Sequence, residues 1–212
     1  LDDLVRDPVA DLEALEPKRN PKIVLPKDLF GAARRNSAGV DLSDPLVREP
    51  LMQRLKALEA RSWTAKPSIG KGEGRAIVSP HDHRITVGTR VQATAAEADR
   101  MVHAGHAAQV DWDALGGEAR AKLLERAADL YEGHAEEFFS LCIREAGKTL
   151  VDAVLEVREA VDFLRFYASE ARRQFTRPLP LPGPTGEQNE LRLHGRGVIA
   201  AIPPWNFPLA IF

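Results

Sequence analysis

The clearest hydrophobic pattern of the chain follows Thr149. Six apolar side chains recur there at alternating intervals of four and three residues. This spacing predicts a long amphipathic helix that begins near Thr149 and buries a single stripe. The stripe consists of Leu150, Val154, Val157, Val161, Leu164 and Ala168.

Further helices are predicted before this one. Thr94 and Glu97 have the spacing of a capping box, in which the hydroxyl and the carboxylate each bind an unpaired backbone N–H. A helix from about Ala135 to Ala146 is expected to end at Gly147, a residue suited to a helix terminus. Another is predicted from about Glu118 to Tyr131, with a core face of Ala121, Leu124, Ala127, Ala128 and Tyr131.

The pattern is shorter in the first part of the chain. A helix is predicted from Asp7 to Leu15, with Pro8 in its first turn. Ser43 and Asp44 are good caps for a second helix, from about Pro45 to Arg61, which carries Leu46, Leu51, Leu55 and Leu58. Two short β-branched stretches, 76–78 and 85–87, indicate strands on either side of a turn at His81 and Asp82.

Residues 18–45 show no sustained period. Prolines and glycines interrupt them at Pro21, Pro26, Gly31, Gly39 and Pro45, which is typical of an extended connector. The cluster Arg34–Ser37 has two interpretations: it docks on a neighbouring folded unit, or it belongs to a solvated linker.

The C-terminal part is expected to change from helix to strand. Residues 178–186 are rich in proline and glycine and predict a turn region. Glu190–His194 alternates polar and apolar residues, as a half-buried strand does. Val198–Ile202 is continuously apolar and predicts a buried parallel strand. The chain is therefore expected to be mainly α-helical with a few short strands.

Composition restricts the class of protein. The 212 residues include 29 Lys and Arg against 31 Asp and Glu, and 44% are hydrophobic, as in globular proteins. The balanced charge argues against sequence-independent binding of nucleic acid through this segment. The chain contains no run of about 18 or more apolar residues, so no membrane-spanning helix is predicted. Leu1–Leu4 does not resemble a secretory leader. One cysteine, Cys142, excludes an internal disulfide framework and fits a reducing compartment.

Several residues that suggest chemistry have simpler explanations. Gly147–Thr149 resembles the end of a phosphate-binding loop. That motif requires a glycine five residues before Gly147, and this chain has Cys142 at that position. Cys142 lies in an apolar helix and is expected to be structural. Two histidine pairs, 81/83 and 103/106, lack further ligands at metal-site spacing and are expected at the surface. Solvated helix-surface positions are expected for most of Arg144, Glu145, Lys148, Asp152, Glu156 and Glu159.

The stretch after Ile202 is the strongest candidate site. It holds three prolines and a Trp–Asn pair, more than a simple turn requires. Asn206 follows the predicted buried strand, and α/β proteins bind ligands at such positions. Its side-chain amide could donate to a developing oxyanion.

The block Pro204–Pro208 (Pro-Trp-Asn-Phe-Pro) resembles the signature near the start of the cofactor domain of the aldehyde dehydrogenase family. Leu141–Leu150, followed by the long helix, resembles the N-terminal region of the same family. The family resemblance implies an α/β aldehyde dehydrogenase-like protein. This chain would hold mainly its N-terminal helices, short strands and the first strand of its cofactor domain.

A narrower resemblance links the chain to the bifunctional flavoenzymes of proline catabolism. It rests on Arg144–Lys148 together with Glu156–Ala168, and on a connector similar to Pro21–Gly31 and Arg35–Asp44. In those enzymes a proline dehydrogenase barrel with FAD precedes the connector. An NAD-dependent L-glutamate γ-semialdehyde dehydrogenase follows it.

This resemblance assigns residues 1–45 to the connector and 46–212 to the truncated N-terminal part of the aldehyde dehydrogenase. It implies that the nucleophilic cysteine and the general-base glutamate follow Phe212, so the chain alone is expected to be inactive. Asn206 would donate to the oxyanion, and Phe207 would wall the aldehyde passage. Pro203 replaces the Ser or Thr of many relatives, so one polar cofactor contact is missing. The nicotinamide side of the NAD cleft would be lined by Ile202, Pro203, Pro204 and Trp205.

Two alternatives stay open. One is a stand-alone aldehyde dehydrogenase with another substrate, which the connector disfavours. The other is a non-catalytic remnant that packs or oligomerises with a partner. For the bifunctional enzyme we expect a small aldehyde substrate, contacts with the remaining parts of its own chain, a homo-oligomer, and a cytoplasmic or peripheral membrane location.

Overall fold

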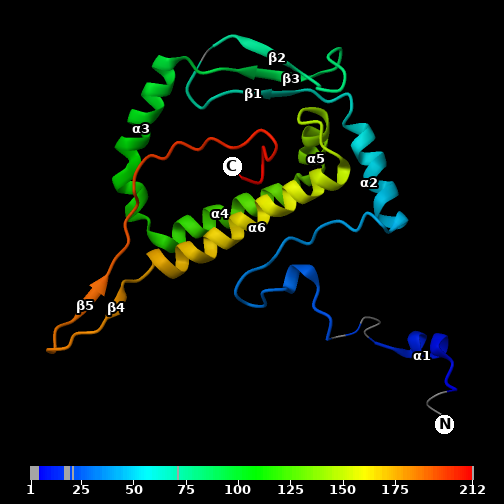
Figure 1. The fold of residues 1–212 in the computed structure, drawn as a ribbon, viewed down its shortest axis with the longest axis horizontal. Helices are drawn as coiled ribbons and strands as arrows, with labels where there is room; N and C mark the ends of the chain where they lie inside the picture. Colours follow the sequence, from blue (N-terminus) through cyan, green and yellow to red (C-terminus); the bar gives the residue numbers. More distant parts are fainter. Residues whose placement is uncertain (1–4, 17–19, 21, 71, 212) are drawn as a thin grey trace.

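The computed structural model describes residues 5–16, 20, 22–70 and 72–211. A small sheet and a pair of long helices enclose the C-terminal segment, while the N-terminal residues extend away from them (Figure 1). The predictions about Leu1–Leu4, Pro21 and Phe212 fall on positions outside these ranges.

All the predicted helices are present within a few residues of their expected limits. Between the first two lies a short 3₁₀ helix, Pro26–Asp28. The helices are α1 (Pro8–Ala14), α2 (Pro45–Ala57), α3 (Ala95–Ala114), α4 (Gly116–Gly133), α5 (Ala135–Arg144) and α6 (Leu150–Phe175). The capping box of α3 is confirmed, with the Thr94 hydroxyl and the Glu97 carboxylate each accepting the other residue's backbone N–H.

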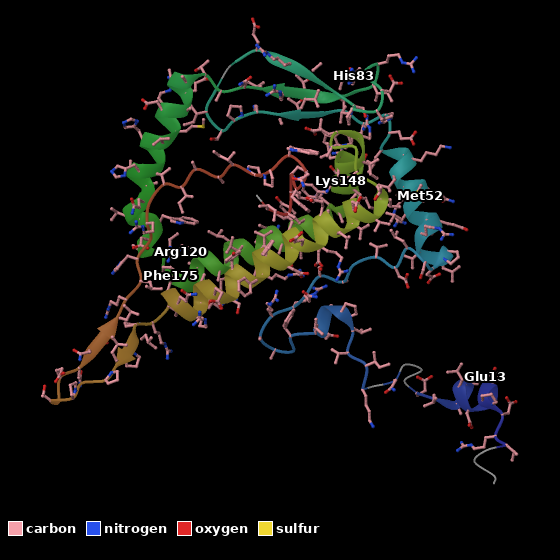
Figure 2. The ribbon with its side chains drawn as sticks, in the orientation of Figure 1. Glu13, Met52, His83, Arg120, Lys148 and Phe175 are labelled. Carbon is pink, nitrogen blue, oxygen red and sulfur yellow. The ribbon has the colours of Figure 1, made fainter. Side chains whose placement is uncertain are left out.

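The core lies where α4 and α6 run side by side in opposite directions (Figure 1). The predicted stripe of α6 is confirmed, since four of its six side chains are buried and the other two, Leu150 and Leu164, are partly buried. At one end of the pair the Arg120 guanidinium lies 4.9 Å from the ring centre of Phe175 (Figure 2). The apolar core consists of Leu51, Leu55, Ala128, Phe139, Cys142, Ala153, Val154, Val157 and Val161.

Gly117 allows the close contact between α4 and α6. A Cβ at this position would overlap the carbonyl oxygen of Ala171 and lie 2.9 Å from the carbonyl carbon of Phe175. Gly117→Ala is therefore expected to lower the free energy of unfolding by about 1–3 kcal/mol, because backbone atoms must shift. Urea denaturation measures this change.

Gly133, the last residue of the same helix, is the matched control. A Cβ there would meet no heavy atom within 4 Å. Gly133→Ala is expected to leave stability unchanged or to raise it by up to about 1 kcal/mol, since alanine favours the helix. Equal stability of the two variants would contradict the overlap at Gly117.

The sheet has the strand order β1–β3–β2. β2 (Gly74–Val78) and β3 (Thr86–Val91) are antiparallel and confirm the two strands predicted around the turn. β1 (Trp63–Ala65) was not predicted. It pairs in parallel with β3, and parallel strands must be far apart in the sequence, so the local pattern around β1 does not reveal its partner.

The Arg34–Ser37 cluster docks on the core. The backbone N–H and the hydroxyl of Ser37 donate to the Asp162 carboxylate at 2.6 and 2.8 Å. The buried guanidinium of Arg165 donates to the Asn36 carbonyl at 3.5 Å and to the Glu132 carboxylate at 2.6 Å. Asn36 and Ser37 are themselves buried, so the docking interpretation is confirmed and the solvated linker is wrong for this cluster.

The predicted buried strand Val198–Ile202 is wrong. The segment forms no strand, and the side chains of Ile199 and Ile202 are 77% and 90% exposed. A parallel strand needs a neighbour to complete its backbone hydrogen bonds, and no strand of the described residues pairs with this segment.

Two smaller predictions also need correction. Of the predicted strand Glu190–His194, only the first two residues are in a strand, β5 (Asn189–Leu191). Its partner β4 (Leu179–Leu181) lies in the region predicted as turn, because the hairpin closes there. Leu46 is 85% exposed, since it lies in the first turn of α2, away from the buried Leu51 and Leu55. Within the described ranges, no helix is long and apolar enough to cross a membrane.

Candidate functional site

The candidate block lies in a series of turns, which we call the Asn206 turn (residues 204–211). The Phe207 N–H donates to the Pro204 carbonyl at 3.2 Å and closes the first of them. Asn206 is exposed, and the Trp205 side chain is 87% exposed. The sequence predicted that Asn206 lies at the end of a buried strand. This prediction is wrong, because Asn206 follows an exposed extended segment.

The Asn206 turn is anchored on α6 by a buried carboxylate. Glu156 is 2% exposed, and its Oε2 accepts the backbone N–H groups of Leu209 and Ala210 at 3.1 and 3.0 Å. Its Oε1 has no hydrogen-bond partner among the described residues and instead lies 3.2 Å from the Lys148 Nζ. A buried charge is costly unless it is paired and hydrogen-bonded, and both conditions are met here.

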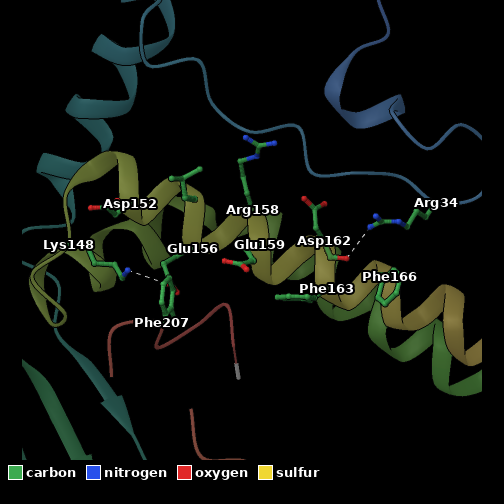
Figure 3. Close-up of a pocket in the computed structure, with 11 residues that line it drawn as sticks. Arg34, Lys148, Asp152, Glu156, Arg158, Glu159, Asp162, Phe163, Phe166 and Phe207 are labelled. Atoms are coloured by element: carbon green, nitrogen blue, oxygen red, sulfur yellow. Dashed lines mark hydrogen bonds and ion pairs between the residues drawn. The ribbon is translucent and has the colours of Figure 1, made fainter. Parts of the chain in front are cut away.

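Lys148 also contacts the turn directly. Its Nζ lies 5.2 Å from the ring centre of Phe207, within the range of a cation–π contact. Figure 3 shows Lys148, Glu156 and Phe207 together at the first turns of α6. The prediction that Lys148 and Glu156 are solvated surface groups is wrong, because the C-terminal segment folds back over this part of the helix.

Phe207 closes one side of a hollow of about 640 Å³ along α6 (Figure 3). Aromatic rings and charged groups share its wall. The hollow is lined by Arg34, Lys148, Asp152, Leu155, Glu156, Arg158, Glu159, Asp162, Phe163, Phe166 and Phe207. Such a mixture suits a small molecule with an apolar stem and charged ends.

The predicted site residues are only partly brought together. Phe207 lines the hollow, whereas Asn206 does not. Among the predicted cofactor-binding residues, Pro203 is half-buried, and Ile202, Pro204 and Trp205 are exposed along the extended segment that leads into the turn.

Glu156 and Lys148 are the site residues that the sequence interpretation missed. A signal for Glu156 was present, since Ala153, Glu156 and Ala160 are spaced by three and four residues and form a second stripe of α6. These three residues are between 0% and 4% exposed. A carboxylate in a stripe of small apolar residues requires donors from elsewhere in the fold, and such an isolated charge could have been recognised.

Lys148 and Thr149 have structural roles that agree with the rejection of a phosphate-binding loop. The Thr149 hydroxyl accepts the Asp152 N–H at 3.1 Å and caps α6. The Lys148 ammonium is paired with Glu156. Both histidine pairs are exposed, and the described residues contain no group of three or more side chains placed to hold a metal.

Cys142 is buried in the core, as expected of a structural residue. Burial raises the pKa of its thiol to about 11. The thiolate, which is the reactive form, therefore appears only as the pH rises toward that value.

Folded protein at pH 7.5 is expected to react with a disulfide reagent at least about 100 times more slowly at Cys142 than urea-unfolded protein does. Equal rates would show that this thiol is accessible and activated.

Comparison with known proteins identifies relatives over the whole chain. The profile of the aldehyde dehydrogenase family matches residues 68–212. The bifunctional protein PutA of Rhizobium meliloti is 39% identical over 221 residues, which cover 100% of this chain and 16% of that protein. The chain thus spans about 16% of the length of the curated PutA relatives it matches.

Two solved structures agree with this result. A crystal structure of bifunctional proline utilization A (PutA) is 37% identical, with a TM-score of 0.74 over 99% of this chain and 19% of that chain. A 1-pyrroline-5-carboxylate dehydrogenase from Thermus with bound NAD is 29% identical, with a TM-score of 0.73 over 84% of this chain and 36% of that one.

Proposed function

Because this chain belongs to the aldehyde dehydrogenase family, we propose that it is part of a bifunctional oxidoreductase of proline catabolism. Its own aldehyde dehydrogenase unit would oxidise L-glutamate γ-semialdehyde to glutamate with NAD. Residues 46–212 would form the N-terminal part of that unit, and residues 1–45 the connector from a proline dehydrogenase barrel with FAD. The barrel and the rest of the dehydrogenase would lie in other parts of the same protein.

The observation that carries this proposal is the match over the connector as well as over the dehydrogenase part. The PutA relative covers 100% of the chain, whereas the Thermus dehydrogenase covers 84%. The docking of Asn36 and Ser37 on α6 supports the same view, because a connector that joins two enzyme units would be expected to contact the core of the second one. A stand-alone dehydrogenase needs no such segment.

Each candidate residue has a role in the proposed reaction. When a thiolate from the rest of the enzyme adds to the aldehyde, negative charge develops on the aldehyde oxygen. The Asn206 amide would donate a hydrogen bond to it. Phe207 would hold the substrate stem, since its ring closes the hollow. The carboxylates of Asp152 and Glu159 in the hollow suit a substrate that carries an ammonium group, as this semialdehyde does.

The proposed cofactor contacts are accessible. Ile202 and Trp205 are 90% and 87% exposed, and the half-buried Pro203 and exposed Pro204 lie between them. Their apolar surfaces fit the flat nicotinamide ring, and Pro203 has no N–H or hydroxyl to offer it. NAD, when bound, supplies the hydride acceptor. These side chains would orient its ring and exclude water.

The test is to measure both half-reactions on the full-length protein. We expect proline-dependent reduction of an electron acceptor through FAD, and NAD reduction with L-glutamate γ-semialdehyde. Aldehyde oxidation without proline oxidation would favour a stand-alone dehydrogenase. The absence of both would favour a non-catalytic remnant. Size-exclusion chromatography with light scattering and cell fractionation would test the proposed homo-oligomer and its cytoplasmic location.

A further inference from the structure

We infer that Glu156 is a positioning residue for aldehyde oxidation: it fixes the Asn206 turn on α6 and thereby orients the Asn206 amide. This role rests on the proposed function of Asn206. Glu156 lines the hollow together with Phe207, but its effect on the reaction is exerted through the backbone of the turn.

The first support is the place of the two hydrogen bonds. Glu156 receives them from Leu209 and Ala210, the third and fourth residues after Asn206, at 3.1 and 3.0 Å. On the C-terminal side of the turn the side chain of Leu209 also packs against the apolar core, Ala210 is buried, and Ile211 is 48% exposed; the two hydrogen bonds fix the backbone at the first two of these residues. A carboxylate that accepts two backbone N–H groups binds them more strongly than a neutral acceptor would.

The second support is a matching contact on the other side of Asn206. Lys148 neutralises Glu156 at 3.2 Å and lies 5.2 Å from the ring centre of Phe207. The ion pair therefore holds the turn both at Phe207, directly after Asn206, and at Leu209 and Ala210. Asn206 itself is exposed, so its orientation depends on these neighbouring contacts.

The third support is the cost of placing this charge. Glu156 is 2% exposed between Ala153 and Ala160, where an alanine would pack without desolvating a carboxylate. The carboxylate is compensated only when the Asn206 turn and Lys148 are both in position. This arrangement defines one position of the turn, and small displacements of a reacting or stabilising group can cost about 100-fold in rate.

The experiment is a double-mutant cycle for kcat of aldehyde oxidation in the full-length enzyme, with Glu156→Ala, Asn206→Ala and the double variant. Glu156→Ala is expected to lower kcat at least about tenfold. In the Asn206→Ala background the same change is expected to cost less than about threefold, because the group that Glu156 orients is already absent. Proline oxidation at the flavin site and the melting temperature are recorded for each variant.

Two further variants separate positioning from a general loss of structure. Glu156→Gln keeps an oxygen that accepts the two N–H groups, so it is expected to recover at least about tenfold of the kcat lost in Glu156→Ala. Glu170→Ala removes a carboxylate from the same helix that is paired with Arg173 at 2.6 Å, and it is expected to leave kcat unchanged.

An equal loss from Glu156→Ala in both backgrounds, an unchanged kcat, or no recovery with Glu156→Gln would overturn the positioning role while the proposed function stands. A wild-type enzyme that does not oxidise the semialdehyde with NAD would overturn the proposed function and the role of Glu156 with it. If Glu156→Ala does not fold, Glu156→Asp carries the cycle, because its shorter carboxylate must draw the turn toward α6 to keep both hydrogen bonds. Glu156→Asp is then expected to lower kcat at least about threefold with Asn206 present and to have no further effect in the Asn206→Ala background. An equal loss in both backgrounds, or no loss in either, would overturn the role.

Discussion

Asn206→Ala is expected to lower the kcat for aldehyde oxidation by about 100-fold or more in the full-length enzyme. The substitution removes an amide donor and little volume, and the turn that carries Asn206 is closed through Pro204 and Phe207 and anchored by Glu156. The donor is therefore held in place before the negative charge develops. No reorganisation of the protein is then needed during the reaction.

Both half-reactions are measured on the same purified variant. Proline oxidation at the separate flavin site is expected to stay within about twofold of wild type, about 0.4 kcal/mol. Asn189→Ala is a matched control, since this amide donates to the Pro182 carbonyl at 3.0 Å within the β4–β5 hairpin. If Asn206 only stabilises its turn, Asn206→Ala will show a normal aldehyde kcat and a lower melting temperature.

The second large effect is expected in the core of α6. Val161 is fully buried and Leu164 is partly buried against the same cluster. The double variant Val161→Ala/Leu164→Ala is expected to lower the free energy of unfolding by about 3–5 kcal/mol, because it removes apolar atoms and leaves a cavity between α4 and α6. Urea denaturation followed by circular dichroism measures the loss.

The control uses the same two residue types on the opposite face of the helix. Val151 and Leu155 are 56% and 50% exposed. The double variant Val151→Ala/Leu155→Ala in the 212-residue chain is expected to cost less than about 1 kcal/mol. Similar losses in both double variants would contradict a buried stripe at Val154, Val157 and Val161.

Local patterns were sufficient for the helices. The stripe of α6, the capping box of α3 and the stop at Gly147, whose φ of 69° suits glycine, each depend on residues within one or two turns. The strands depended on distant partners. β1 pairs in parallel with β3 across more than 20 residues and escaped prediction, and Val198–Ile202 was predicted as a strand although no described strand pairs with it.

The candidate site was likewise predicted only where local sequence was sufficient. The unusual composition of residues 203–208 identified the turn, and Phe207 does line the hollow. Glu156 was assigned to solvent because i,i+4 reasoning considers one helix in isolation. Its partners, Leu209 and Ala210, are 53 and 54 residues away in the sequence. The docking of Ser37 on Asp162 spans 125 residues, which is why the cluster around it allowed two interpretations.

The order of the helices has a consequence for synthesis. α4, α5 and α6 follow one another from Gly116 to Phe175, and the core lies largely among them. Contacts between consecutive elements close short loops and form quickly. A growing chain, which lengthens by about 5–20 residues per second, can therefore assemble this bundle before the Asn206 turn leaves the ribosome. Until Ala210 has left the ribosome, the Glu156 carboxylate remains hydrated. The turn then packs on a helix that has already formed.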